Sequence, residues 1–201
     1  MKRLLLTVIL FCFALTFSFA QTGAFQEAAS DHYRVFSEVS LAHAQETADM
    51  LDAYLNFYNT YLHFDTNDLS AKLKVRIFAN KTNFDSYLST LIPQKRDSFV
   101  YLQYKDLAKS ELLGFYLDDS SFQKAVVHHG FIQFLKAFIP NPPLWLQKGF
   151  AVYIEKSTYD EENQTVDFVD NLVWVKTMKN IINGEVCNNE MWTDRPLLVP
   201  F

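Results

Sequence analysis

The sequence predicts one α+β domain, in which a small mixed sheet with flanking helices is followed by a pair of central helices. Before residue 118, short segments that alternate apolar and polar residues are interspersed with segments of helical apolar spacing. Residues 121–155 read as two helices separated by the Pro-rich turn 139–143. The 201 residues are 49% hydrophobic and 20% charged, which suits one globular domain with a full core.

The N-terminal 20 residues have the pattern of a signal peptide. Lys2 and Arg3 precede an apolar run at 4–17, and small residues follow, so cleavage is expected before Gln21. The run is shorter than the roughly 20 residues of a membrane-spanning helix, so we expect no membrane span after cleavage. The sequence therefore predicts an exported protein, periplasmic or extracellular, with residues 21–201 as its single domain.

Charge and cysteine content exclude some functions. Loss of Lys2 and Arg3 with the signal peptide takes the formal charge from −5 to −7, and no cluster of Lys or Arg is present. An acidic chain without a basic patch is not expected to bind nucleic acid. Cys187 is then the only cysteine, so the exported domain must be held by its core without an internal disulfide.

The elements expected before the central helices alternate between strand and helix. They are a strand at 32–37, a helix at 41–62 capped by Ser40, a strand at 73–78, a helix at 80–92, and a hairpin of strands at 99–104 and 111–117. Residues 21–30 are expected to be a polar lead. His43 and His63 are expected to be solvated side chains at the two ends of the helix 41–62.

The first central helix is expected to be buried. Asp118, Asp119 and Ser120 supply its N-terminal cap and favourable negative charge. One face carries His128, Ile132, Leu135 and Ile139, the neighbouring face carries His129, Gln133 and Lys136, and most of the rest is apolar. A helix that is apolar nearly all round packs in a core, and Gly130 leaves room for another segment to approach. Beyond the second central helix, we expect a polar turn at 157–163, a strand at 165–169, a helix at 171–182 and an apolar tail at 192–201.

Two segments resemble the active-site helices of gluzincin-type zinc metallopeptidases, in particular the peptidase-MA-like families. Ala-Val-Val-His-His-Gly-Phe-Ile-Gln at 125–133 is similar to their H-E-x-x-H helix. Pro-Leu-Trp-Leu-Gln-Lys-Gly-Phe-Ala-Val-Tyr at 143–153 is similar to their W-L-x-E-G-x-A-x-Y helix, and the spacing of about 20 residues between the two segments also fits. The resemblance implies a zincin-like pair of central helices, in which Trp145, Gly149, Ala151 and Tyr153 pack the second helix against the first.

The resemblance also implies that most of the catalytic positions have been replaced. In such a site two histidines one turn apart and a glutamate hold zinc, and a second glutamate activates water. Here His128 keeps the first ligand position, His129 stands at the general base, Ile132 at the second ligand and Lys148 at the third. We therefore expect no catalytic residue, no metal ligand set and no cofactor at these four positions.

The replacements suggest a metal-free site. Lys148 would place an ammonium where the charge of zinc would lie and would donate to neutral His128 or to a nearby carboxylate; in the simpler alternative it points to water. His128 and His129 are expected to be buried, hydrogen-bonded structural residues. Glu155 is a further candidate ligand, two turns beyond Lys148.

Three hypotheses for function follow. The first is an exported, non-catalytic peptidase-like protein that binds a peptide or protein in the former substrate cleft or serves as a structural module. The second is an active zinc metallopeptidase with displaced ligands, drawn from Asp118, Asp119, Glu155 or the histidines near the N-terminus. The third is a non-functional family member truncated at the C-terminal end of 21–201.

Overall fold

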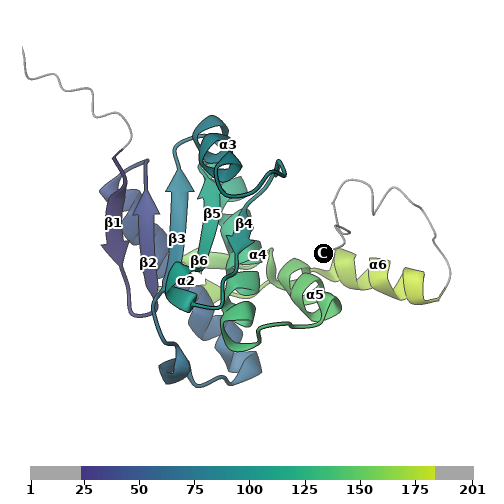
Figure 1. Ribbon diagram of the computed structural model, residues 1–201. Helices are drawn as coiled ribbons and strands as arrows, with labels where there is room; N and C mark the ends of the chain where they lie inside the picture. Colours follow the sequence, from purple (N-terminus) through teal and green to yellow (C-terminus); the bar gives the residue numbers. More distant parts are fainter. Residues whose placement is uncertain (1–23, 184–201) are drawn as a thin grey trace, which may run out of the picture.

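A five-stranded mixed sheet forms the centre of the computed structural model, which describes residues 24–183 (Figure 1). In spatial order its strands are β1 (Gln26–Ala29), β2 (Tyr33–Ser37), β3 (Leu73–Phe78), β5 (Glu111–Phe115) and β4 (Val100–Leu102). The three inner strands are parallel, and each edge strand is antiparallel to its neighbour. Together with the helices, this sheet confirms the α+β class.

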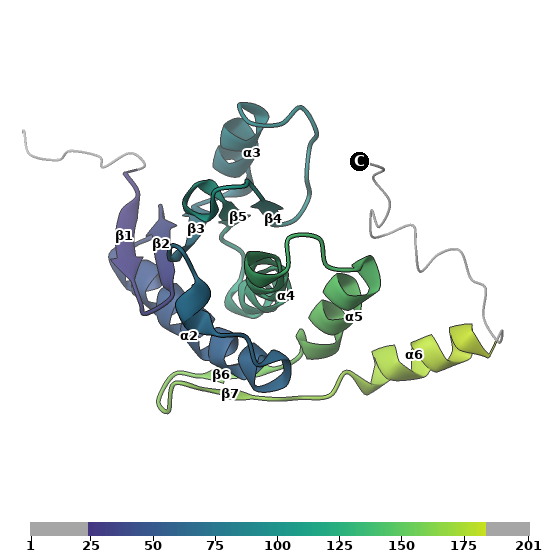
Figure 2. The same ribbon diagram turned by 60° about the horizontal axis from the view of Figure 1, so that its bottom comes forward.

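Helices cover both faces of the sheet, with the larger pair on one side (Figure 2). The helices are α2 (Leu41–Leu62), α3 (Lys81–Ser89), α4 (Asp119–Phe138), α5 (Leu144–Ile154) and α6 (Leu172–Ile182), with short 3-10 turns at Thr66–Asp68 and Leu107–Lys109. Helices α2 and α4 lie on one face, α3 lies on the other, and α5 packs on α4. A hairpin of β6 (Thr158–Asp160) and β7 (Thr165–Asp167) crosses α2. Within residues 24–183, no helix combines the length and apolar character needed to cross a membrane.

Side-chain caps fix where three of the helices begin. The hydroxyl of Ser40 accepts from the backbone N–H of His43 at 3.0 Å, which starts α2 at the expected residue. A carboxylate oxygen of Asp118 accepts from the N–H of Ser121 at 3.1 Å and starts α4 in the same way. Asn80 caps α3. These caps satisfy backbone donors that a helix leaves unpaired at its N-terminus.

The expected strands and helices are present, but two short strands were not predicted. Residues Gln26–Ala29, expected to be a polar lead, form β1, which pairs with β2. Thr158–Asp160, expected to be part of a polar turn, forms β6. Neither segment alternates apolar and polar residues, so its sequence does not predict a strand. Each is held as a strand mainly by backbone pairing with its neighbour. Two other elements are shorter than predicted: the helix at 80–92 ends at Ser89 and the strand at 99–104 covers Val100–Leu102.

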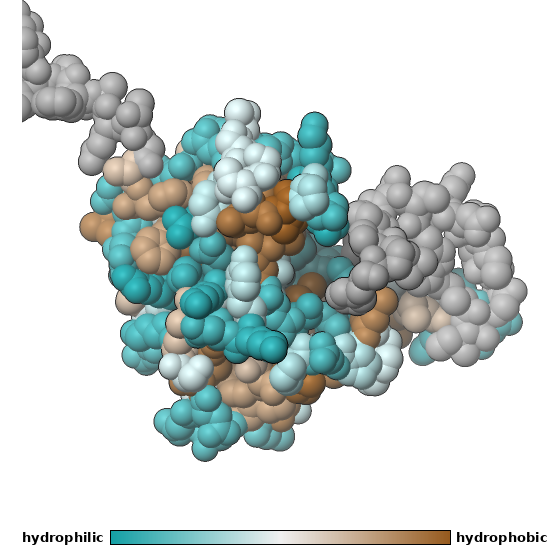
Figure 3. All heavy atoms as spheres, in the orientation of Figure 1, coloured by the Kyte–Doolittle hydropathy of each residue, from teal (hydrophilic) through white to brown (hydrophobic). Residues whose placement is uncertain are grey.

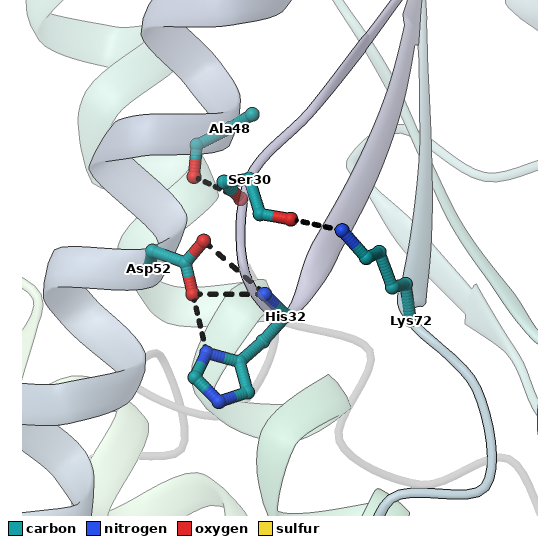
Figure 4. A network of polar contacts seen from close by, with 5 residues as sticks. All are labelled: Ser30, His32, Ala48, Asp52 and Lys72. Atoms are coloured by element: carbon teal, nitrogen blue, oxygen red, sulfur yellow. Dashed lines mark hydrogen bonds and ion pairs between the residues drawn. The ribbon is translucent and has the colours of Figure 1, made fainter.

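A polar network ties the turn between β1 and β2 to α2 (Figure 4). The carboxylate of Asp52 accepts from the backbone N–H of His32 at 3.2 Å and lies 2.7 Å from its ring Nδ1. The hydroxyl of Ser30 donates to the carbonyl of Ala48 at 3.1 Å, and Lys72 donates to the carbonyl of Ser30. These contacts attach the turn before β2 to the middle of α2 and so fix where β2 begins.

Helix α4 packs against several other elements. Figure 2 views it nearly along its axis, with the sheet above it and α2 and α5 on either side. Its buried residues are Phe122, Val126, Val127, Gly130, Phe131, Ile132, Gln133, Phe134 and Leu135. A Cβ atom on Gly130 would lie 3.0 Å from Cδ2 of Leu51, so the glycine allows α2 to approach closely. The expected burial of this helix is confirmed.

Two glycines, one in β5 and one in α5, offer a matched test of how closely these elements are packed. A Cβ atom on Gly114 in β5 would lie 2.4 Å from the ring of Phe99, whereas nothing lies within 4 Å of the corresponding position on Gly149 in α5. Gly114→Ala is expected to lower the free energy of unfolding by about 1–3 kcal/mol through overpacking. Gly149→Ala is expected to raise it by roughly 0.5–1 kcal/mol through helix propensity. Urea unfolding of the two variants measures both, and equal midpoints would contradict the described packing.

Candidate functional site

The candidate site lies where α4 packs against α5. Lys124 and His128 of α4 approach Glu155, the residue that follows α5, and His129 lies near Lys148 of α5. Phe131 of α4 and Phe150 of α5 stack with ring centroids 5.9 Å apart, which holds the two helices together beside the site. The helix pair therefore brings these ionisable groups together from segments about 20 residues apart in sequence.

A buried carboxylate is at the centre of the site. Oε2 of Glu155 lies 3.2 Å from Nδ1 of His128, and Oε1 lies 3.6 Å from Nζ of Lys124. The side chain of Glu155 is 6% exposed, so water screens its charge poorly. Lys124 and His128 are one turn apart on the same face of α4, which lets both reach one carboxylate. A buried carboxylate requires such partners, because leaving it unpaired is costly.

The orientation of His128 follows from this contact. An ionised carboxylate only accepts hydrogen bonds, so Glu155 favours the form of the ring that donates from Nδ1. Nε2 then faces away from this carboxylate. A carboxylate at Nδ1 is also the usual partner that orients a histidine whose other nitrogen binds a metal.

His129 is held as a neutral ring. It stacks on Phe99 with centroids 5.8 Å apart, and the ring of His128 lies 4.9 Å away. Burial lowers the pKa of His129 well below its ordinary value of 6.5, and the nearby charges of His128 and Lys148 lower this pKa further. The surroundings of His129 therefore disfavour the uptake of a proton, which makes the ring a weaker base than an ordinary histidine.

Ile132 and Lys148 complete the four sequence-predicted positions. Ile132 is buried in the core beside Gln133, whose amide donates to the carbonyl of Lys74 at 2.9 Å. Lys148 is half-buried, and its charge acts on His129. An alkyl side chain has no ligand atom and an ammonium repels a cation, so these side chains do not fit a zinc ion held by three protein ligands. Within residues 24–183, no group of three or more His, Cys, Asp and Glu residues is arranged to hold a metal ion.

The packing roles predicted for α5 are only partly correct. Ala151 is fully buried, as expected. Trp145 is instead 70% exposed, because it lies in the first turn of α5, on a side that α4 does not cover. Tyr153 is half-buried and donates to the carboxylate of Asp170, which ties α5 to the segment before α6.

His43 also differs from its prediction, whereas His63 does not. The ring of His43 is half-buried, packs on Tyr116 and Phe122 with centroids 5.5 and 4.8 Å away, and lies 3.1 Å from the hydroxyl of Ser37. Burial lowers its pKa. The reason is that the first turn of α2 packs beside the start of α4. His63 is exposed and ends α2 in the left-handed conformation, with φ of 54°.

The role of Glu155 was not predicted. Its position after the second central helix suggested only a metal ligand, whereas the structure pairs it with His128 and Lys124. The available signal was the spacing of Lys124 and His128, which places a cation and an imidazole on one turn of α4. Cys187, the other chemically reactive residue of the expected mature chain, lies outside the described residues.

Comparison with protein-family models finds no family that matches this chain, and comparison with curated proteins finds no match either.

The buried histidines predict a dependence of stability on pH. Since burial lowers the pKa of both His43 and His129 in the folded protein, the unfolded chain takes up protons first as the pH falls below about 6.5. The free energy of unfolding should therefore fall on acidification, by up to about 1.4 kcal/mol per pH unit for each histidine. Urea unfolding between pH 7.5 and 5 measures the slope. His129→Gln should reduce the slope and the exposed-site control His63→Asn should not; an unchanged slope in His129→Gln would contradict the assignment.

The buried carboxylate predicts a second effect on stability. Glu155→Gln keeps the shape of the side chain but removes the charge that His128 and Lys124 approach. Hydrogen bonds to charged groups contribute about 1.5–3 kcal/mol, so a loss of this size is expected in the free energy of unfolding at pH 7.5. Glu161→Gln, on the exposed hairpin, should change it by less than about 0.5 kcal/mol. If both substitutions changed the free energy of unfolding equally, the contacts of Glu155 would not contribute to stability as described.

Proposed function

We propose that this chain is an exported, non-catalytic relative of the peptidase-MA-like metallopeptidases, which has kept the helix pair of the active site and uses the adjoining surface to bind a peptide or protein. The observation that carries the proposal is the contact between His128 and Glu155 across α4 and α5. A histidine oriented by a carboxylate is what the proposed former zinc site would have needed, and in this proposal His129, Ile132 and Lys148 stand where the base and the other two ligands would be.

The neighbouring sheet edge supports a binding role. β4 is an edge strand, antiparallel to β5, and it lies beside α4. An edge strand presents backbone donors and acceptors to which an extended peptide can add as a further strand. Phe99, directly before β4, contacts His129 of the candidate site. A peptide bound along β4 would therefore pass beside the α4–α5 site, with Lys148 as a cation near its path.

Restoring the replaced residues tests the proposed relationship. A triple variant, His129→Glu, Ile132→His and Lys148→Glu, supplies the base and the two missing ligands beside His128. If α4 and α5 are a former zinc site, the purified variant should bind close to one zinc ion per chain, measured by elemental analysis and by titration with a chromogenic chelator.

The same triple variant carrying His128→Ala is the matched control and should bind zinc at least tenfold more weakly. Circular dichroism establishes that both variants are folded. A folded triple variant without zinc affinity would overturn the proposed relationship.

The binding role has its own test. Labelled peptides of varied sequence, screened by fluorescence anisotropy, should include ligands whose affinity falls about tenfold in Lys148→Glu, which corresponds to about 1.4 kcal/mol. Lys95→Glu, an exposed charge reversal in the turn before β4, should leave the affinity unchanged. Cleavage of an unfolded protein that a chelator and His128→Ala both abolish would instead establish a metallopeptidase with displaced ligands, and would overturn the non-catalytic proposal.

A further inference from the structure

One face of the sheet is covered only in part. Helix α3 packs on β3 and β5, and Figure 2 shows no helix of the described chain on that side of β1 and β2. This open face is turned toward the viewer in Figure 1, and Figure 3 shows hydrophilic side chains among a few apolar ones over it. It lies on the opposite side of the sheet from α4, so it is separate from the candidate site.

The register of β2 and β3 brings three cations together on the open face. Arg34 of β2 is the cross-strand partner of Lys74. Phe36 of β2 is the partner of Arg76, whose guanidinium lies 5.2 Å from the ring of Tyr87 on α3. Partnered residues, and residues two apart along a strand, share one face of a sheet, with spacings of roughly 5 and 7 Å. Lys74 is therefore flanked by Arg34 across the strands and by Arg76 along β3.

An aromatic ring and two carboxylates hold the guanidinium groups in place. The guanidinium carbons of Arg34 and Arg76 each lie 5.2 Å from the ring centroid of Phe36. Nε of Arg34 donates to Glu27 at 2.6 Å. Nε of Arg76 donates to Glu111 at 3.3 Å. Among residues 24–183 only these Nε atoms have an acceptor, so the Nη groups of both side chains remain as donors in the guanidinium planes.

Lys74 lies among like charges and has no acidic partner in the described chain. None of the ion pairs formed within residues 24–183 includes it. Glu111, its neighbour on β5, pairs with Arg76 and accepts from the hydroxyl of Tyr87 instead. Like charges directly opposite each other on a sheet are destabilising, and the pair of Arg34 and Lys74 is of this kind. An anion bound between these cations would remove the repulsion.

We propose that Arg34, Lys74 and Arg76 bind the phosphate group of a small, soluble phosphate ester on the open face of the sheet. A phosphate group presents three acceptor oxygens in different directions, so it can accept from all three cations, whereas a planar carboxylate presents two oxygens. The N–H donors of a guanidinium also match pairs of phosphate oxygens.

The structure favours a soluble ligand that meets donors already in position. Stacking on Phe36 and the two Nε hydrogen bonds orient the guanidinium groups before a ligand arrives, which lowers the entropy lost on binding. An anionic membrane surface is disfavoured by the formal charge of −5 of the chain. The proposal does not depend on the relationship to peptidases or on a peptide ligand.

Titration of the purified protein with inorganic phosphate tests the site. At pH 7.5 and constant ionic strength, phosphate should shift the ¹⁵N-resolved Nε–H signals of Arg34 and Arg76 along a saturating curve, with a Kd at or below about 1 mM. Lys74→Gln removes the charge and keeps most of the side-chain length, and it should weaken binding about tenfold. Lys105→Gln, an exposed charge removal after β4, should leave the affinity unchanged. Circular dichroism establishes that both variants are folded.

The same titration separates the proposed ligand from other occupants. Phosphate shifts that do not saturate, or that are equal in Lys74→Gln and the parent protein, would overturn the proposal. Acetate that gives the same saturating shifts at the same ionic strength would assign the open face to carboxylates instead. Sedimentation with phosphatidylglycerol vesicles, weakened by Lys74→Gln in a protein that inorganic phosphate does not shift, would assign it to a membrane surface and would also overturn the proposal.

Discussion

The enclosure of α4 is the constraint on which the rest of this structure depends. One helix contacts the sheet, α2 and α5 at once, so nearly every position around its circumference must suit a different neighbour. Gly130 lets α2 approach, Phe131 stacks on α5, and Gln133 satisfies a strand carbonyl. The hydroxyl of Tyr58 donates to the carbonyl of Val127 at 2.9 Å, so α2 also contributes a hydrogen bond inside this packing. A polar residue on such a helix persists only with a partner, which explains why His128 meets a carboxylate.

The sequence was sufficient for the main elements because their signals are local. The cap at Ser40, the alternation at 73–78 and the apolar circumference of α4 all depend on neighbouring residues, and the structure agrees with each. β1 and β6 could not be predicted in this way, since their strand conformation depends on pairing partners. Trp145 was misjudged for a related reason: the pattern identified it as apolar, but its exposure depends on where α5 lies relative to α4.

At the candidate site, too, features that depend on neighbouring residues were predictable from the sequence, and a contact between distant residues was not. The four positions were identified from a motif, and the polar environment of His128 was anticipated as hydrogen-bonded. Its partner, Glu155, was not identified, because the contact spans 27 residues and depends on the crossing of two helices. The two neighbouring histidines have different surroundings. The ring of His128 lies beside the carboxylate of Glu155, whereas His129 lies against Phe99 and near Lys148, and the charged form of His129 is disfavoured.

The hydrogen bond from the hydroxyl of Tyr54 to the carbonyl of Ser157 has a consequence for the order of folding. It joins residues 103 positions apart, from the first long helix to the segment that enters the β6–β7 hairpin. A loop of this length closes slowly, because its entropy must be lost before the contact forms. The local caps and the pairing of β1 with β2 can form early, whereas the hairpin reaches α2 only after the sheet and α4 have assembled. The contacts between the hairpin and α2 should therefore be among the last to form.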